Sequence, residues 1–369
     1  MRVVLTGGGT GGHLYPALAI GRAVMDDHPN SSLLYIGTRR GLENRIVPQH
    51  GIAFEAIDVS GFRRKLTWDN VRTVIRFVNG VKRSKVLLRR FKPDVVIGTG
   101  GYVCGPVVYA ASKLGIPTLI HEQNVAPGLT NKFLSRYASA VAVSFAESVE
   151  QFARCPYVVH AGNPCASTAM KANPGKGFAS LGLTNGEPFV LVAGGSGGAR
   201  ALNDAIAEMI PFLPELSKVH FVFVTGERFY EETEAKAKKL LPVVSNRVHL
   251  YPYIHNMPEV LSAASLFVGR AGASFIAEIT SLGIPAILIP SPNVTNNHQE
   301  ANAKSLADRG AAELLLESDL SGERLFARIA SIMGDPARRN AMAQASRKLG
   351  MPNAAQTILT QMNRITRRT

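Results

Sequence analysis

Short apolar runs alternate along this chain with longer segments in which apolar residues recur at helical spacing. Short runs rich in β-branched residues are typical of buried strands, whereas helical spacing is typical of amphipathic helices. The expected strands are Arg2–Thr6, Ser32–Ile36, Phe54–Val59, Asp94–Ile97, Thr118–His121, Ala140–Ser144, Phe189–Ala193, His220–Thr225, Val248–Tyr251, Leu266–Val268, Ala286–Ile289 and Ala312–Leu315. The helices expected between them include Pro16–Asp27, Asn203–Phe212, Ala273–Leu282 and Asn297–Asp308. Strands that alternate with helices in this way predict parallel sheets built from βαβ units.

The two halves of the chain open with the same pattern. Val3–Thr6 leads into the glycine-rich turn Gly7–His13, and Val190–Ala193 leads into Gly194–Arg200. A strand, a glycine-rich turn and a helix begin a Rossmann-like nucleotide-binding fold, whose ligands lie at the carboxyl ends of the strands. We therefore predict an α/β protein with two Rossmann-like domains that have parallel sheets and face each other across a cleft. The predicted division is 1–163, 164–352 and a C-terminal helix over 353–369 that could return to the first domain.

The composition fits two globular domains in a reducing compartment. The chain has 369 residues, about twice the length of a typical domain, with 46% hydrophobic and only 18% charged residues. Three cysteines without a C-x-x-C pair argue against a disulfide framework and against a cysteine-built zinc site. The apolar run at the start is too short for a signal peptide, and no window is apolar enough for a transmembrane span. We expect a cytoplasmic location.

The charge is strongly positive, because 41 Lys and Arg residues outnumber 27 Asp and Glu residues and give a net charge of +14. Nucleic acid, an anionic membrane surface and phosphorylated substrates are all compatible with this balance. Residues 62–92 contain eleven basic residues and a single acid, with Val74, Ile75 and Val78 on one helical face. The segment has no nucleic-acid recognition module, so we expect no nucleic acid partner. We expect docking on an anionic lipid surface through Arg63, Arg64, Lys65, Trp68, Arg72, Ile75 and Arg76.

Three glycine-rich turns predict an anionic ligand. Besides Gly7–His13 and Gly194–Arg200, the turn Gly98–Tyr102 follows an apolar strand. Glycines let a backbone approach a phosphate, and the helix that follows presents free N–H groups with a partial positive charge. A dehydrogenase would place an acid after the second strand to hold a ribose. The chain has Arg39 and Arg40 there instead, which leaves open only a phosphorylated ribose. The turns lack the P-loop pattern, which disfavours a P-loop nucleotidase.

Polar side chains follow several of the predicted strands. Glu278 lies one turn inside the helix after Gly272 and could accept both hydroxyls of a ribose, or only interact with the helix dipole. Residues 296–300, Asn-Asn-His-Gln-Glu, suit sugar hydroxyls but are also typical of a capped helix start. The run 121–124, His-Glu-Gln-Asn, is either a second ligand contact or ordinary loop polarity. His13, beside the first turn, is a candidate general base or phosphate contact.

Taken together, the motifs resemble one family. Gly8–His13, Gly100–Tyr102, His121–Asn124, Gly194–Arg200 and Gly272–Glu278 occur in the order and spacing of the MurG family, the GT-B-fold N-acetylglucosaminyltransferases of peptidoglycan synthesis. The resemblance covers essentially the whole chain. It implies transfer of N-acetylglucosamine from UDP-N-acetylglucosamine (UDP-GlcNAc) to the C4 hydroxyl of undecaprenyl-linked lipid I, with inversion, at the inner face of the cytoplasmic membrane. Other cell-wall synthesis proteins could be further partners. The chain has no Asp-x-Asp motif, and we expect no metal and no cofactor.

The resemblance also implies the site residues. It makes His13 either the base that takes the hydroxyl proton or a contact to the acceptor's diphosphate. The acceptor side would comprise Thr10, Gly11, Gly12, His13, Gly101, Tyr102 and Asn124. The donor side would comprise Thr10, Gly11, Gly12, Asn124, Ser196, Ile254, Ala273, Ser274, Phe275, Glu278, His298 and Gln299. In that set Ile254 would meet the uracil through its backbone, Glu278 the ribose and Ser196 the diphosphate.

Two positions depart from the family pattern, and one of them is His298, where some relatives carry glutamine. Relatives usually place an arginine shortly after Pro164, where this chain has Cys165 and Ala166. Arg200 or Arg270 would then have to replace that arginine. Two other readings stay open: a glycosyltransferase of the same fold with another lipid acceptor, such as diacylglycerol, and a non-enzymatic binding module. Comparison of a lipid-linked muropeptide with diacylglycerol as acceptor distinguishes the first of these readings. Release of UDP that depends on the lipid-linked acceptor distinguishes the second.

Overall fold

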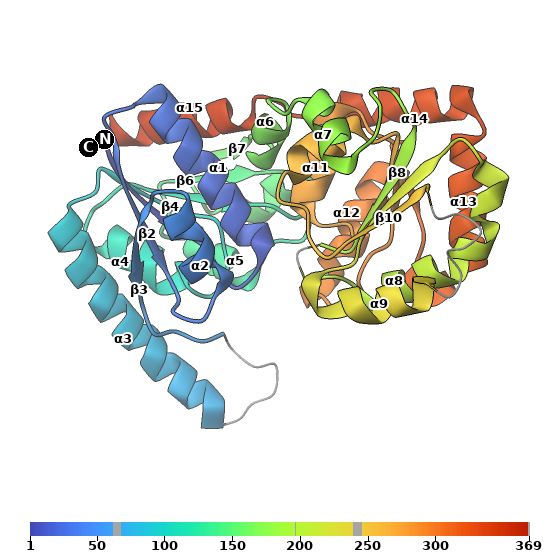
Figure 1. The fold of residues 1–369 in the computed structure, drawn as a ribbon. Coiled ribbons are helices and arrows are strands. Elements are labelled where there is room, and N and C mark those ends of the chain that lie inside the picture. The colour runs from blue at the N-terminus through green and yellow to red at the C-terminus, as the bar shows by residue number, and fades with distance from the viewer. Residues whose placement is uncertain (62–67, 196, 239–245, 368–369) are drawn as a thin grey trace. The chain divides into compact units, whose positions relative to one another are not determined.

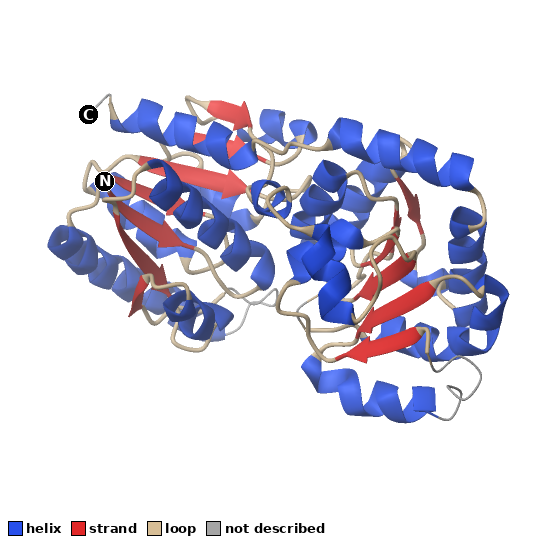
Figure 2. Ribbon diagram, turned by 45° about the horizontal axis from the view of Figure 1, so that its top comes forward, coloured by secondary structure: helices blue, strands red, loops and turns tan. Residues whose placement is uncertain are grey.

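The structure, a computed structural model, describes residues 1–61, 68–195, 197–238 and 246–367. The chain packs into two compact units (Figure 1). Unit 1 comprises Met1–Ser167 together with Asn353–Thr369, and unit 2 comprises Thr168–Pro352. Each unit has its own parallel sheet with helices packed on it (Figure 2). The predicted α/β class with two parallel-sheet domains is confirmed.

The sheet of unit 1 has seven parallel strands in the order β3-β2-β1-β4-β5-β6-β7. Their bounds are β1 (Arg2–Thr6), β2 (Ser32–Gly37), β3 (Ala53–Ala56), β4 (Val95–Gly98), β5 (Thr118–Glu122), β6 (Ala140–Val143) and β7 (Val158–His160). The order reverses between β1 and β4, and ligands of open α/β sheets bind outside the carboxyl ends of the strands at such a point. The loops after β1, β4 and β5 are therefore the expected place for a site.

Helices bury both faces of this sheet, which explains its unbroken apolar strands. They are α1 (Gly11–Asp27), α2 (Leu42–Gln49), α3 (Trp68–Phe91), α4 (Cys104–Lys113), α5 (Leu129–Leu134), η1 (Ala146–Phe152), α6 (Cys165–Ala169) and α15 (Ala354–Thr366). Val3 and Leu5 of β1 pack in one core cluster with α1 and α15, whereas Val4 packs in another with α3 and α4. The last helix of the chain lies beside the first (Figure 1).

The sheet of unit 2 has six parallel strands in the order β10-β9-β8-β11-β12-β13, which repeats the arrangement of the first six strands of unit 1. They are β8 (Phe189–Ala193), β9 (His220–Val224), β10 (Val248–Tyr251), β11 (Leu266–Gly269), β12 (Ala286–Leu288) and β13 (Ala312–Leu314). The helices are α7 (Pro174–Leu181), α8 (Arg200–Met209), η2 (Ile210–Leu216), η3 (Glu227–Phe229), α9 (Tyr230–Lys238), α10 (Met257–Ala263), α11 (Ala273–Leu282), η5 (Thr295–Asn297), α12 (His298–Ala307), η6 (Glu317–Asp319), α13 (Gly322–Met333) and α14 (Pro336–Leu349). The order reverses between β8 and β11, so the expected site lies at their carboxyl ends.

All strands expected from the sequence are present, with their ends shifted by a few residues. The structure adds β7, whose three residues are too few to show a hydrophobic period. Helix α1 begins at Gly11, ahead of the predicted start at Pro16. Two glycines fill its first turn, where the N–H groups have no helical partner, so the pattern of good helix formers starts later than the helix.

Candidate active site

Two glycine-rich loops of unit 1 pack directly against each other at the carboxyl edge of its sheet. A Cβ on Gly101, whose φ is +81°, would lie 2.2 Å from the carbonyl oxygen of Gly8. A Cβ on Gly8 would lie 2.5 Å from Oε1 of the buried Glu43, and one on Gly7 would lie 2.1 Å from Oγ1 of Thr99. Packing between the loops therefore requires glycine at these positions before any ligand binds.

The start of α1, by contrast, faces outward. Thr10 is the N-cap residue, but its side chain makes no capping hydrogen bond, and the first turn carries no acid. Thr10 and Gly12 are exposed, and Gly11 is partly exposed. The first N–H groups of a helix have no helical partner, and they lie at its positive end. Uncapped and exposed, this turn is suited to bind an anion such as a diphosphate.

His13 lies in the first turn of α1 and contacts the other two loops. Its Nδ1 lies 3.0 Å from the carbonyl oxygen of Thr99 and 3.2 Å from Oε1 of Gln123. The hydroxyl of Thr99 in turn donates to the carbonyl oxygen of His13 at 2.7 Å. The histidine is therefore held where the loops after β1, β4 and β5 meet, next to the uncapped helix start.

The polar cluster at the end of β5 is mostly turned inward. His121, Glu122 and Gln123 are at most 1% exposed. Glu122 accepts hydrogen bonds from the backbone N–H groups of Asn124 at 3.0 Å and Gly128 at 3.1 Å, so it shapes the loop after β5. Burial lowers the pKa of His121 to about 4, which leaves this side chain neutral at physiological pH. Asn124 is the member of the cluster that keeps exposed surface.

Tyr102 covers the first glycine loop. A Cβ on Gly9 would lie 3.3 Å from its ring, yet the side chain remains 37% exposed. The expected acceptor residues thus lie on three loops at one edge of the sheet of unit 1: Thr10, Gly11, Gly12, His13, Gly101, Tyr102 and Asn124. The hydrogen bond between His13 and Gln123 ties the first of these loops to the last.

In unit 2 the start of α11 offers a second place for an anion. Gly272, its N-cap, would meet no atom within 4 Å if it carried a Cβ, so the space beside it is open. The buried Oγ of Ser274 has no hydrogen-bond partner in the described part of the chain. Ala273 is buried, and Phe275 stacks on Phe267 with ring centroids 5.0 Å apart, so both can offer only backbone N–H groups. An orphaned hydroxyl beside uncapped N–H groups indicates a missing acceptor such as a phosphate oxygen.

Glu278 lies one turn further into α11. Burial alone raises the pKa of its carboxyl group to about 8, and among the described residues no charge or hydrogen bond opposes that effect. The positive end of a helix would lower a carboxyl pKa, so the dipole interaction considered from the sequence does not account for this residue. The side chain keeps some exposed surface. Such a carboxyl group is suited to ligand hydroxyls, because hydrogen bonds from a ligand stabilise its ionised form.

The loop before α12 has an uncommon backbone. Asn296 and Asn297 have φ of 55° and 48°, in the left-handed region that residues other than glycine rarely adopt. Asn297 is the N-cap of α12, but its side chain makes no capping hydrogen bond. Oε1 of Gln299 accepts from the backbone N–H of Ser291 at 2.9 Å, so Gln299 holds this loop in place. His298 is partly exposed beside it.

Of the two remaining donor candidates, the structure describes Ile254 but not Ser196. Ile254 is 6% exposed, so its side chain packs inward and its backbone is the part that could meet a base. Ser196 lies outside the described residues. On either side of it, Gly195 and Gly197 would meet no atom within 4 Å if they carried a Cβ. Packing does not demand glycine at these two positions, which fits close approach of a ligand.

The arginines suggested as substitutes for the missing family arginine are already engaged. Arg200 donates to both carboxylate oxygens of Glu232, at 2.8 and 2.9 Å. Arg270 forms an ion pair with Glu317 and donates to two backbone carbonyls. Residues 165–166 are themselves buried. The guanidinium group of Arg270 is thus committed to contacts within the protein, whereas that of Arg200, whose side chain is 57% exposed, is engaged only in a surface ion pair.

The predicted membrane segment is described only in part. Outside the described residues lie Arg63, Arg64, Lys65 and the side chain of Trp68. The described candidates Arg72, Ile75 and Arg76 are all exposed on α3. Helix α3 packs on α4 through a face that includes Phe77 and Gly80. Across the described residues, no helix is both long and apolar enough to span a bilayer.

Two residues that shape the edge of unit 1 had no signal of their own in the sequence. Glu43 is fully buried and accepts from the backbone N–H of Thr38 at 3.0 Å and from its hydroxyl at 2.7 Å. In sequence it is an ordinary acid at the start of a helix. Thr99 lies inside the second glycine-rich turn, where the glycines were the only visible motif.

Comparison with known proteins agrees with the fold and extends over almost the whole chain. Residues 3–143 match the glycosyltransferase family 28 N-terminal domain, and residues 189–358 match the C-terminal domain of the same family. A crystal structure of MurG from Acinetobacter baumannii has a TM-score of 0.75 and 29% sequence identity, and the match covers 98% of this chain and 99% of that one.

Two curated relatives are more similar in sequence. The UDP-N-acetylglucosamine–N-acetylmuramyl-(pentapeptide) pyrophosphoryl-undecaprenol N-acetylglucosamine transferase 1 of Bacillus cereus is 52% identical over 369 residues, all of both chains. The transferase of the corresponding name from Halalkalibacterium halodurans is 53% identical over 358 residues, which is 97% of this chain and 98% of the relative. The chain therefore belongs to glycosyltransferase family 28 and, within it, to the family of these N-acetylglucosamine transferases.

Proposed function

We propose that this chain transfers N-acetylglucosamine from UDP-GlcNAc to the C4 hydroxyl of lipid I in peptidoglycan synthesis. The observation that carries the proposal is the 52% identity, over the full length of both chains, to a transferase of that name. The geometry supports it, because each unit has a helix start without a side-chain cap at the carboxyl edge of its sheet. A reaction between a sugar diphosphate and a lipid diphosphate needs two such anion sites.

Unit 2 is the donor side of this proposal. The N–H groups at the start of α11 and the orphaned hydroxyl of Ser274 would bind the diphosphate of UDP-GlcNAc. Glu278 would accept hydrogen bonds from the ribose hydroxyls, for which its unpaired carboxyl group is suited. The loop of Asn296 and Asn297 would contact the sugar, and the backbone of Ile254 the uracil.

Unit 1 is the acceptor side. Its uncapped helix start, Thr10–Gly12, would bind the diphosphate of lipid I. Tyr102, which covers the glycine loop and keeps exposed surface, and Asn124 on the neighbouring loop would contact the rest of the acceptor. His13 lies one residue beyond the helix start, within reach of a hydroxyl carried by a ligand bound there.

The chemistry is a single displacement. The bond between the anomeric carbon and UDP breaks, a bond to the acceptor oxygen forms on the opposite side, and the hydroxyl proton passes to His13. Negative charge gathers on UDP as its bond breaks, where the N–H groups of α11 and the hydroxyl of Ser274 would stabilise it. A positioned general base contributes a rate factor of about 10²–10⁴.

We also propose that unit 1 docks on the anionic inner face of the cytoplasmic membrane. Val74, Ile75 and Val78 of α3 are 50%, 55% and 46% exposed, an apolar surface flanked by exposed arginines. Aromatic rings on α3, on α4, on α5 and shortly after α5 form a cluster with neighbouring centroids 5.1 to 6.3 Å apart: Phe77, Tyr109, Phe133 and Tyr137. Exposed apolar side chains with aromatic neighbours are typical of surfaces that enter the membrane interface.

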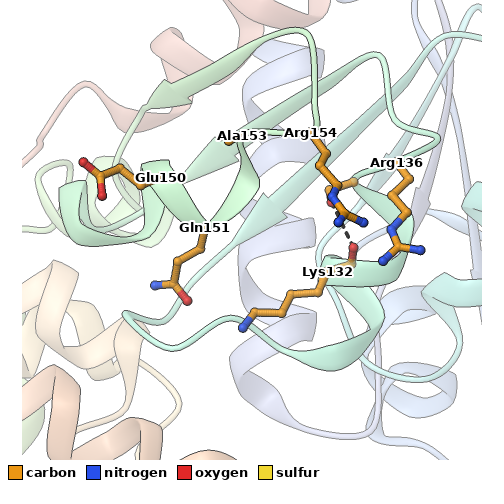
Figure 3. Close-up of a pocket in the computed structure, with 7 residues that line it drawn as sticks. Lys132, Arg136, Glu150, Gln151, Ala153 and Arg154 are labelled. Atoms are coloured by element: carbon orange, nitrogen blue, oxygen red, sulfur yellow. Dashed lines mark hydrogen bonds between the residues drawn. The ribbon is translucent and has the colours of Figure 1, made fainter.

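A basic pocket adjoins the aromatic cluster. Lys132, Arg136 and Arg154 line a pocket of about 360 Å³ that has Glu150 as its single acid (Figure 3). Lys132 and Arg136 are chain neighbours of the clustered aromatics. Within the described part of the chain these three cations form no ion pair. Each would add about 1 kcal/mol of attraction to an anionic lipid surface.

Vesicle binding tests the docking proposal. Arg136→Gln combined with Arg154→Gln should weaken binding to phosphatidylglycerol vesicles at low salt by about tenfold or more, because two surface cations are lost. The matched control, Lys176→Gln with Lys218→Gln, removes the same charge from exposed positions of unit 2 and should bind like the wild type. Equal weakening in both double variants would contradict docking through unit 1.

Turnover tests the transferase itself. With UDP-GlcNAc and a short-chain lipid I analogue, UDP release should rise with acceptor concentration and fall to background without acceptor. UDP-glucose and UDP-N-acetylgalactosamine serve as donor controls, and diacylglycerol as the acceptor control. Release that is independent of lipid I, or equally fast with diacylglycerol, would overturn the proposed function.

A further inference from the structure

Gln123 is a buried side chain at the candidate site to which the proposed chemistry gives no role. It lies directly after β5, and it is 1% exposed. Its amide group bridges two histidines, because Oε1 lies 3.2 Å from Nδ1 of His13 and Nε2 lies 3.0 Å from Nδ1 of His121. A buried amide has two donors and one acceptor oxygen, so its partners dictate which way it points.

The hydrogen-bond partners of Gln123 allow only one orientation of its side-chain amide group. Its Nε2 donates to the carbonyl oxygen of Thr99 at 2.7 Å and to that of His121 at 3.1 Å. Nε2 of His121 lies 3.0 Å from the carbonyl oxygen of Gly162, which can only accept. The neutral His121 ring therefore carries its proton on Nε2 and accepts at Nδ1. Three acceptors thus surround the NH₂ group of Gln123, and its oxygen must face His13.

This orientation fixes the tautomer of His13. Nδ1 of His13 faces two acceptors, the carbonyl oxygen of Thr99 at 3.0 Å and Oε1 of Gln123. Two acceptors at one ring nitrogen require that nitrogen to carry the proton. In the neutral ring, the lone pair then lies on Nε2. A histidine held the other way round would present an N–H donor at Nε2 and could take no proton there.

We infer that Gln123 is a positioning residue for the transfer reaction: together with the carbonyl oxygen of Thr99 it accepts from Nδ1–H of His13, so that Nε2 is the atom that accepts the hydroxyl proton. As the acceptor O–H bond breaks, an N–H bond forms at Nε2. The positive charge that His13 gains is stabilised at Nδ1–H by Oε1 of Gln123 and the carbonyl oxygen of Thr99. The role of Nε2 as base rests on the proposed function, whereas the tautomer does not.

Nitrogen NMR tests the inference on the intact chain without a substrate. In ¹⁵N-histidine-labelled wild type at a pH where the ring is neutral, His13 should show a protonated Nδ1 and an unprotonated Nε2. The His13→Asn spectrum assigns the signals. An Nε2–H tautomer in the wild type would overturn the inference, and this result needs no variant of Gln123.

The variant Gln123→Met keeps the side-chain length but removes the amide. The carbonyl oxygen of Thr99 still accepts from Nδ1–H in this variant, so we expect the tautomer to remain. The second acceptor for the positively charged ring is lost, so we expect a decrease in kcat of about 10- to 100-fold, with the KM for UDP-GlcNAc unchanged. Gln356→Met, at an exposed position of α15, is the matched control and should behave like the wild type.

Each outcome for a folded Gln123→Met is decisive. A lowered kcat with an unchanged KM supports positioning for the reaction, whereas a wild-type kcat would contradict it, whichever tautomer the variant shows. If the wild type shows the expected tautomer but no transfer to lipid I, the proposed function fails while the tautomer assignment stands.

Discussion

At the scale of single residues, protonation of Glu278 links the stability of the fold to pH. Its pKa of about 8 lies above the ordinary carboxyl value because burial disfavours the charged form. Between pH 4.5 and 8 the unfolded chain has released this proton while the folded chain retains it. The folded state binds more protons in that window, so the contribution of Glu278 to stability falls as the pH rises.

Binding of the donor should instead favour the ionised form of Glu278. Hydroxyl donors of the ribose favour the ionised carboxylate, so at pH 7 the wild type should release protons when UDP-GlcNAc binds, and its affinity should rise with pH up to about 8. Calorimetry in buffers of different ionisation enthalpy measures the release. Glu278→Gln should bind more weakly, with no proton release from this site. Identical proton release by the variant and the wild type would remove Glu278 from the donor site.

The sequence predicted some of these residues better than others. Glu278 and the glycine turns were predictable, because their spacing from a strand end is local. The role of Gln123 depends on residues from distant parts of the chain, and that of Glu43 on Thr38 nearby and on the close approach of Gly8. Such contacts cannot be identified from the sequence around either residue. The apolar positions of α3 show the same limit. The sequence showed an apolar face with Ile75 on it, but only the packing of α3 on α4 shows that this face is exposed.

At the scale of elements, two interlocked glycine loops shape the acceptor edge of unit 1. The carbonyl of Gly8 occupies the place where Gly101 would carry a Cβ. The loops after β1 and β4 therefore pack backbone against backbone at this point. Glycine richness, taken from the sequence as a mark of phosphate binding, thus has a second cause in loop packing.

Alanine substitutions distinguish glycines that loop packing requires from glycines that packing does not require. Gly101→Ala should lower the free energy of unfolding by about 2 kcal/mol or more, since it adds a clash with backbone to a left-handed φ. Gly195 also has a positive φ, +89°, but the space around it is open. Gly195→Ala should therefore lower the free energy of unfolding by only about 1 kcal/mol. Chemical denaturation compares the two variants. A smaller cost for Gly101→Ala than for Gly195→Ala would refute the interlock.

At the scale of the whole molecule, the chain leaves unit 1, builds unit 2 and returns. The inner face of α15 supplies side chains to the core of unit 1 that are at most 5% exposed: Ile358, Leu359, Met362 and Ile365. The sequence predicted a terminal helix but not the domain on which it packs, because an amphipathic pattern shows that one face is buried without showing against which surface. The stability of unit 1 therefore depends on the last residues of the chain.

Met362→Ala should destabilise unit 1 by about 2–5 kcal/mol, because it leaves a cavity among fully buried side chains. Hydrogen exchange of the intact protein locates the effect. Amides of β1 should lose protection, while those of β8 should keep it. Thr360→Ala, on the exposed side of α15, is the matched control. Equal loss of protection in β1 and β8 would contradict the dependence of unit 1 alone on this helix.

The structure of the reaction product tests the central claim most directly. The wild type is incubated with UDP-GlcNAc and a lipid I analogue, and the product is examined by mass spectrometry and NMR. A single N-acetylglucosamine should be joined to the C4 oxygen of the muramoyl sugar, with the β configuration opposite to that of the donor. An α linkage, attachment at another oxygen, or UDP release without a new glycoside would contradict the account.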